Sequence, residues 1–209
     1  MSTDTTGQRN VIAFNGSPRK RGNTETLLDA ALEGVRSTGA NAISFAVGNL
    51  QVIPCQNCGY CSRHGACRLA DKDDMGQVYR SIDTATRFLT ASPVYFATVS
   101  AQLKTLIDRC QVFWSRKFVL EEKPRVPDRK GILLAVGGFD HRGFWPCTQK
   151  VVRTWYVCCD VNYLGGLFYH KIDARGDIAR HPTALEEAFE AGKRLVAGEG
   201  PDPSAAGAK

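Results

Sequence analysis

The sequence lacks the features that would place the chain in a membrane or divide it into separate units. No apolar run approaches the roughly 20 residues that cross a bilayer, and the polar stretch from Met1 to Asn10 has no apolar secretory core. No internal repeat or linker interrupts the 209 residues. We therefore expect a cytoplasmic protein without a membrane partner, with one domain over residues 1–197 and a flexible, Gly/Pro/Ala-rich tail over 198–209.

Several motifs of other functional classes are also missing. The sequence has no G-x-G-x-x-G fingerprint, and five residues separate Gly16 from Gly22, with Asn23 where a P-loop has lysine. It shows no His–carboxylate or Ser–His pairing for acid–base or nucleophilic catalysis. The net charge of +6 is spread along the chain apart from the Arg19-Lys20-Arg21 cluster. Without a groove-reading motif, that charge does not indicate a nucleic-acid partner.

Apolar runs instead alternate with amphipathic helical patterns along the chain. The runs predict five buried strands, at 11–14, 42–47, 87–91, 131–136 and 161–170, and the patterns predict intervening helices that include 71–85 and 182–196. This order is typical of an α/β protein with a doubly wound five-stranded parallel sheet. Ligands of such sheets bind beyond the carboxyl ends of the strands, so the loops after the first, third and fourth strands are the candidate site.

The loop after the first strand favours an anion. It runs from Gly16 to Thr24 and ends at a helix start, where free N–H groups and the helix dipole attract negative charge. Ser17, Asn23 and Thr24 add polar donors, and Arg19 adds a charge-assisted contact. Taken alone, the loop could also be an ordinary polar connection in which Asn23 or Thr24 caps the helix.

The other two loops suit a planar, mostly apolar ligand. Pro93 to Phe96 place a rigid proline and two aromatic residues after the third strand, and Gly137-Gly138 permit close approach of backbone after the fourth. A flavin ring has this character. Further segments around Trp114 and from Phe139 to Trp145 are candidates for an acceptor pocket.

A compact group of cysteines follows the second strand. Cys55, Cys58, Cys61 and Cys67 form the pattern C-x2-C-x2-C-x5-C within a loop over 54–70. Two-residue gaps let a tight loop wrap thiolates around an iron–sulfur cluster, as in bacterial ferredoxins. Structural zinc sites generally use two pairs with a longer spacer, so the spacing favours [4Fe–4S] over zinc. The other cysteines, Cys110, Cys147, Cys158 and Cys159, are scattered, and we interpret them mainly as core or near-surface thiols.

The loop sequences Asn15–Thr24 and Ser92–Lys104 together resemble the NADPH-dependent FMN reductase family of flavodoxin-like proteins, over about Val11 to Gly138. In that family the first loop grips the FMN phosphate and the second lies against the isoalloxazine ring. The resemblance implies a phosphate site and a ring side in this chain. The phosphate residues are Ser17, Arg19, Gly22, Asn23 and Thr24, and the ring-side residues are Pro93, Val94, Tyr95, Phe96, Ser100, Gly137 and Gly138.

The added cysteine tetrad is similar to that of the iron–sulfur flavoprotein family. This resemblance implies an electron-transfer oxidoreductase in which a [4Fe–4S] cluster and FMN exchange electrons, with NAD(P)H or ferredoxin as donor. It also implies a homodimer or homotetramer with the cluster of one subunit close to the FMN of another. Two alternatives stay open: an NAD(P)H-dependent FMN or quinone reductase without a functional cluster, and a zinc-containing redox-sensing or nucleic-acid-binding module.

Overall fold

The computed structural model describes residues 9–140 and 142–208. Its strands form one parallel five-stranded sheet in the order β2-β1-β3-β4-β5. The strands are β1 (Asn10–Asn15), β2 (Asn41–Ala46), β3 (Arg87–Pro93), β4 (Arg129–Val136) and β5 (Val161–Tyr169). The chain moves from β1 out to β2 and then crosses to β3 on the other side of β1. This confirms the predicted doubly wound sheet, and it places the switch in strand order between β1 and β3.

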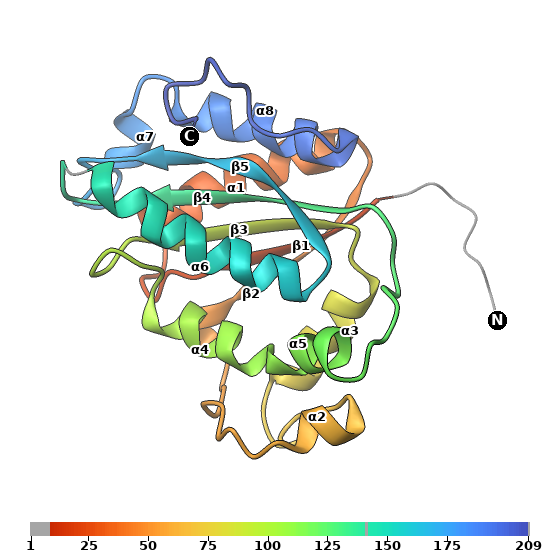
Figure 1. Cartoon of the computed structure of the whole chain (residues 1–209). Coiled ribbons are helices and arrows are strands. Elements are labelled where there is room, and N and C mark those ends of the chain that lie inside the picture. Colours follow the sequence, from red (N-terminus) through yellow and green to blue (C-terminus); the bar gives the residue numbers. More distant parts are fainter. Residues whose placement is uncertain (1–8, 141, 209) are drawn as a thin grey trace.

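Helices cover both faces of the sheet (Figure 1). One face carries α1 (Asn23–Ser37), α7 (Asp177–Arg180) and α8 (Ala184–Ala197), and the other carries α3 (Met75–Thr84), α4 (Ala101–Arg109), α5 (Gln111–Phe118) and α6 (Trp145–Cys158). Side chains alternate along a strand, so Val11 and Ala13 pack with α1 and α8, whereas Ile12 and Phe14 pack on the opposite layer. Burial on both faces explains why the strands read as nearly continuous apolar runs.

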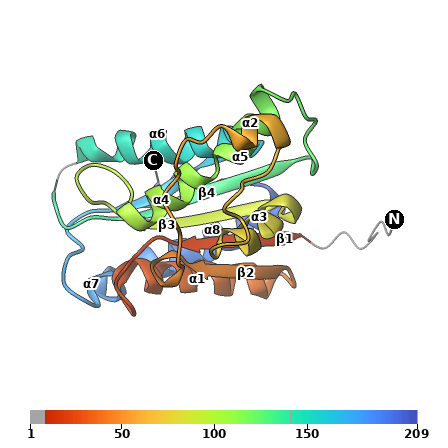
Figure 2. The same ribbon diagram turned by 90° about the horizontal axis from the view of Figure 1, so that it is seen from below.

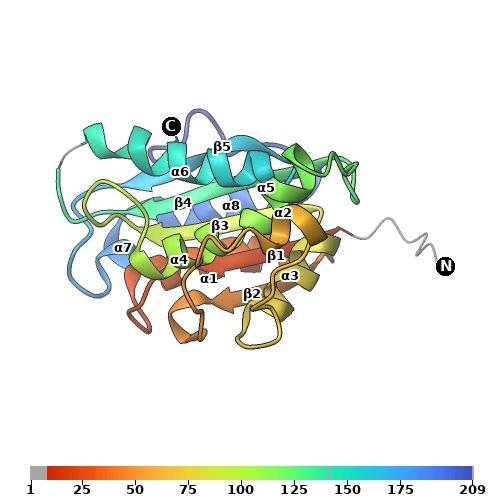
Figure 3. The ribbon, with the colours of Figure 1, turned by 60° about the horizontal axis from the view of Figure 1, so that its bottom comes forward.

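The cysteine segment is an insertion between β2 and α3, as predicted. It includes the short helix α2 (Tyr60–His64), which contacts α5 and lies on the side away from the sheet (Figure 1). Figures 2 and 3 show the same insertion from below, in front of α5. The helix predicted from Asp71 begins only at Met75. The reason is that the preceding residues tie down the insertion: Asp73 accepts hydrogen bonds from the backbone of Ile53 (2.9 Å) and of Met75 (3.0 Å).

The segment expected to be a flexible tail instead packs against the edge strand β5. The Phe168 N–H donates to the Gly207 carbonyl (2.7 Å), and the Glu187 carboxylate of α8 accepts from the amides of Ala206 (2.9 Å) and Gly207 (3.1 Å). An edge strand presents unpaired backbone groups, and residues 205–208 satisfy part of that edge. The small residues that suggested disorder therefore permit close packing here.

Candidate flavin site and cysteine centre

The loop between β1 and α1 is shaped by its own polar side chains. The Ser17 N–H donates to Asn15 Oδ1 (3.0 Å), and the Ser17 hydroxyl accepts from the Arg19 N–H (3.1 Å). A Cβ on Gly16 would lie only 2.9 Å from a Leu103 methyl and 3.0 Å from the Ala91 carbonyl oxygen. Glycine at this position therefore lets the backbone at the end of β1 pass close to β3 and α4 as it enters the loop.

The first turn of α1 leaves backbone donors for a ligand. The first N–H groups of a helix have no acceptor within the helix itself. Gly22, which precedes α1, supplies no side-chain cap for them. Arg19 stands beside this turn and uses only one long contact, from its Nη1 to the Asp173 carbonyl (3.4 Å), among the described residues. A helix N-terminus with an adjacent guanidinium is suited to a phosphate.

The Asn23 side chain makes a contact that the sequence did not reveal. Its amide nitrogen donates to the Ala174 carbonyl (2.9 Å), and its Oδ1 accepts from the N–H groups of Gly176 (3.0 Å) and Ile178 (3.3 Å). The side chain therefore joins the first loop to the loop after β5. These hydrogen bonds fix that second loop beside the start of α1.

Ten of the twelve predicted flavin-site residues line one cavity at the carboxyl edge of the sheet. The loops after β1, β3 and β4 all reach it, as the parallel strand order requires. Its lining contains Ser17, Arg19, Gly22, Asn23, Thr24, Pro93, Val94, Tyr95, Gly137 and Gly138. Ile172 and Asp173, from the loop after β5, also line it and were not anticipated. The rule that all parallel strands end at one edge could have indicated them.

A second, apolar cavity of about 380 Å³ adjoins the first, a volume within the ~300–1,000 Å³ of small-molecule sites. The two cavities share Val94, Tyr95 and the glycine pair, so they form one continuous site. The remaining lining is mostly aromatic: Phe96, Ala97, Phe139, Phe144 and Trp145. The predicted acceptor segment from Phe139 to Trp145 thus contributes to this cavity, whereas Trp114 lines a separate groove between α6 and the helices α4 and α5.

The turn that carries Phe96 holds two non-glycine residues in the left-handed region. Tyr95 and Thr98 exchange backbone hydrogen bonds (2.9 and 3.1 Å), while Phe96 and Ala97 between them have φ of 48° and 66°. Such a turn is normally made by Asn and Gly, so these residues store backbone strain. Its effect is to leave the Phe96 side chain fully exposed at the cavity mouth.

Ser100 does not lie with the other predicted ring-side residues. Ser100 is fully buried and lines neither cavity. Its hydroxyl donates to the Gly16 carbonyl and accepts from the Leu103 N–H (3.2 Å), which makes it the N-cap of α4. The assignment of Ser100 to the ring is therefore corrected, because its hydroxyl already caps α4 and bonds the Gly16 carbonyl.

All four cysteines of the insertion line one small cavity between the loop and the α4–α5 junction. Cys55 and Cys58 are exposed, whereas Cys61 and Cys67 are half-buried. Within the described residues no three His, Cys, Asp or Glu side chains converge as they would around a single metal ion. The four thiols nevertheless match the donor set of a [4Fe–4S] cluster, in which each cysteine binds a different iron and the sulfurs need not meet at one point.

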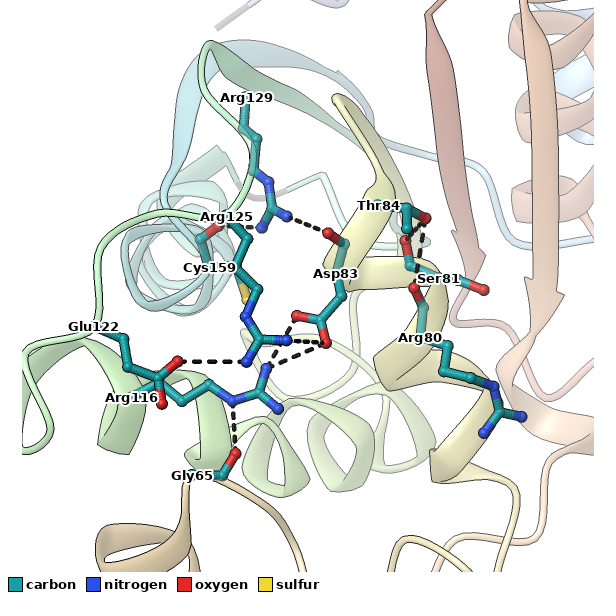
Figure 4. Close-up of polar contacts among 10 residues, drawn as sticks. All are labelled: Gly65, Arg80, Ser81, Asp83, Thr84, Arg116, Glu122, Arg125, Arg129 and Cys159. Carbon is teal, nitrogen blue, oxygen red and sulfur yellow. Dashed lines mark hydrogen bonds and ion pairs between the residues drawn. The ribbon is translucent and has the colours of Figure 1, made fainter. Parts of the chain in front are cut away.

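Side chains from the underlying helices hold the cysteine loop from its inner side. Arg116 of α5 donates from Nε to the Gly65 carbonyl (2.6 Å) and from Nη1 to the Asp83 carboxylate (3.0 Å), as Figure 4 shows. Asp83, at the end of α3, also accepts from Arg125 (3.3 Å). This buttress links the second half of the loop to α3 and α5, which gives the loop a defined shape.

Three of the other cysteines lie where burial disfavours the thiolate form. Burial raises the pKa of the Cys110 thiol to about 12, and it also raises the pKa of Cys158 and Cys159. Since the thiolate is the metal ligand and nucleophile, these residues act as apolar core or near-core groups, as predicted. Cys147 is exposed near the start of α6.

Comparison with known proteins agrees with this arrangement. Residues 9–166 match the family model described as NADPH-dependent FMN reductase. An iron–sulfur flavoprotein of Methanocaldococcus jannaschii is 36% identical over 194 residues, which cover 89% of this chain and 95% of the relative. An iron–sulfur flavoprotein of Archaeoglobus fulgidus is 34% identical over 147 residues, 70% of this chain and 71% of the relative.

The chain therefore belongs to the NADPH-dependent FMN reductase family and, within it, to the iron–sulfur flavoproteins. This membership makes it an FMN-dependent oxidoreductase.

Solved structures show the same fold. An NAD(P)H:quinone oxidoreductase from Methanothermobacter marburgensis has a TM-score of 0.69 at 16% identity, over 90% of this chain and 96% of that one. A flavodoxin, WrbA-like protein from Agrobacterium tumefaciens has a TM-score of 0.57 at 14% identity, over 91% and 96%. The fold is thus flavodoxin-like. Among residues 9–140 and 142–208, none of the helices combines the length and apolar content that a bilayer crossing needs.

Proposed function

We propose that this protein binds FMN at the carboxyl edge of the sheet and a [4Fe–4S] cluster at Cys55, Cys58, Cys61 and Cys67. Electrons pass between the two centres, with NAD(P)H or a ferredoxin as donor and a small molecule as acceptor. The observation that carries the flavin part is the convergence of four separate loops, after β1, β3, β4 and β5, on one continuous site.

The two halves of that site suit the two halves of FMN. The half beside α1 has unsatisfied N–H groups and Arg19 for the phosphate. The half beside β3 and β4 has aromatic side chains and the Gly137-Gly138 backbone for a flat ring. A Cβ on Gly138 would lie 3.2 Å from Asp173, so glycine at this position lets the loops after β4 and β5 lie close together. When bound, FMN supplies the hydride and electron chemistry, and these residues bind and orient it.

The cysteine loop is supported by its donor set and by its preformed shape. Four thiols line the same cavity, and the loop is held at both ends by Asp73, Asp74 and Arg116. A loop fixed before binding loses less conformational freedom when ligands assemble on it. This favours a cluster over four incidental free thiols.

The separation of the two sites supports the relay between subunits that the family resemblance implies. The cysteine cavity shares no lining residue with either flavin-site cavity, and the insertion lies below α4 and α5 while the flavin site lies at the strand ends (Figure 1). We propose a homodimer or homotetramer in which the cluster of one subunit approaches the FMN of another.

Anaerobic purification with an absorption spectrum and counts of FMN, iron and sulfide tests this proposal. We expect flavin bands with a broad absorbance that dithionite bleaches, and about four iron and four sulfide per chain. FMN without iron, together with steady NADPH turnover, would support a reductase without a cluster. A colourless zinc protein that shifts DNA in a salt-sensitive manner would support the binding module instead.

A further inference from the structure

Two side chains outside the cysteine motif donate hydrogen bonds to its sulfur atoms. The Ser115 hydroxyl of α5 donates to Cys61 Sγ (3.3 Å), and Nη2 of Arg109, the last residue of α4, donates to Cys67 Sγ (3.5 Å). Neither residue is part of the motif or close to it in sequence. Cys55 and Cys58 receive no side-chain hydrogen bond from the described residues and are exposed. The cavity therefore has a hydrogen-bonded inner side and a solvent-facing outer side.

Both donors are fixed and shielded from water. Ser115 is fully buried, and Arg109 is 2% exposed. The Arg109 guanidinium pairs with the buried Asp73 carboxylate and donates to the Ile53 carbonyl (2.6 Å). Asp73 also receives the N–H of Ile53, so it joins Arg109 to the entry of the cysteine loop. Water does not reach these donors to compete for the sulfur atoms, and a hydrogen bond is electrostatically stronger in surroundings of low polarity.

The Arg109 guanidinium retains a further donor. Its Nε is buried and has no hydrogen-bond acceptor among the described residues, and Arg109 lines the cysteine cavity. A buried donor without a partner costs free energy. Sulfur atoms of a cluster in that cavity are acceptors of the kind this side chain lacks.

We propose that Ser115 and Arg109 set the reduction potential of the cluster through Cys61 and Cys67; this inference rests on the cluster proposed above. One-electron reduction adds one negative charge, which is shared by the iron and sulfur atoms. Donors to sulfur stabilise the more negative form and so raise the potential. The Asp73 carboxylate neutralises the charge of Arg109, so the directed hydrogen bond, rather than net charge, carries the effect.

The measurement is a spectroelectrochemical titration of the holoprotein with its cluster and FMN. Ser115→Ala removes one hydroxyl from a buried position and leaves the cysteines intact. We expect about tenfold less reduced cluster at a fixed potential, which for one electron corresponds to 59 mV. Ser81→Ala is the matched control, because the Ser81 hydroxyl of α3 donates only to the Gln77 carbonyl (3.0 Å). It should leave the potential unchanged.

Arg109→Lys is the second variant and should shift the potential in the same direction, since lysine cannot reach Asp73 and sulfur as a planar fork does. If this variant does not fold, Ser115→Ala decides the question. An unchanged or higher potential in Ser115→Ala, with iron and sulfide at wild-type levels, would overturn this inference and leave the proposed function standing. A wild-type protein that holds FMN but no iron would overturn both.

Discussion

Replacing Asn23 by alanine tests whether the loop after β5 belongs to the flavin site. In the structure the Asn23 side chain makes three hydrogen bonds to that loop, two accepted from backbone N–H groups and one donated to a carbonyl. The same loop contributes Ile172 and Asp173 to the cavity. Alanine would leave these backbone groups without their partner and release the loop from α1.

The size of the effect follows from the number of bonds. A hydrogen bond contributes about 1 kcal/mol net, so losing three should cost about 2–3 kcal/mol in the free energy of unfolding. For a chain of this length that lowers Tm by about 4–12 °C. FMN would then also have to order the loop when it binds. Since about 1.4 kcal/mol is tenfold in affinity, we expect a Kd for FMN about ten- to a hundredfold higher.

Thermal unfolding of the flavin-free protein and fluorescence titration with FMN measure the two quantities. Asn41→Ala is the control, because the Asn41 side chain is exposed at the start of β2. Asn23→Asp keeps the acceptor for Gly176 and Ile178, so it should preserve more of the stability while its charge repels the phosphate. If Asn23→Ala melts like the wild type and binds FMN equally well, the link between the two loops has no energetic role.

Three further predictions concern other parts of the chain. Cys58→Ser should lose iron and sulfide yet keep FMN, measured by metal analysis and flavin absorbance, because the two cavities share no residue; loss of both would show that they are coupled. Phe96→Gly should leave Tm unchanged or higher, since glycine tolerates a φ of 48°. The same variant should bind FMN about tenfold more weakly, because apolar contact with the ring is lost. An undiminished FMN affinity would contradict the ring-side role. Burial alone would raise the pKa of the Glu187 carboxyl, but hydrogen bonds from Tyr169 and two tail amides hold it below its ordinary value. The stabilisation that these hydrogen bonds give to the charged carboxylate is present above the unfolded pKa of about 4.3 and is lost as pH falls through the lower folded pKa. The Tm advantage of the wild type over Glu187→Gln should therefore shrink as the solution is acidified below that unfolded pKa; a pH-independent difference would show that the charge is not involved.

The sequence located most of the residues that line the candidate flavin cavity, because the loops that carry them have local features. Turn-forming residues after each apolar run mark the loops, and parallel strands place those loops at one edge. This is why the loops that carry Ser17, Gly22 and Gly138 could be placed beside one cavity without a structure. The placement of Ser100 on the ring side, which rested on the family resemblance, is not supported, because only the path of β1 past α4 shows that its hydroxyl reaches the Gly16 carbonyl. Sequence reasoning also missed Asp173, which lies more than 150 residues from its partner Arg19.

The sequence by itself determined the strand and helix alternation, the polar loop after β1 and the cysteine spacing, since each depends on residues that are neighbours along the chain. Only the tertiary structure decided how these parts are held. Asn23 joins two loops, Glu187 fastens the terminal segment, and Arg109 and Ser115 reach the cysteine sulfurs. Each of these contacts depends on the direction of one side chain across a folded interface, and no local pattern of residues encodes that direction.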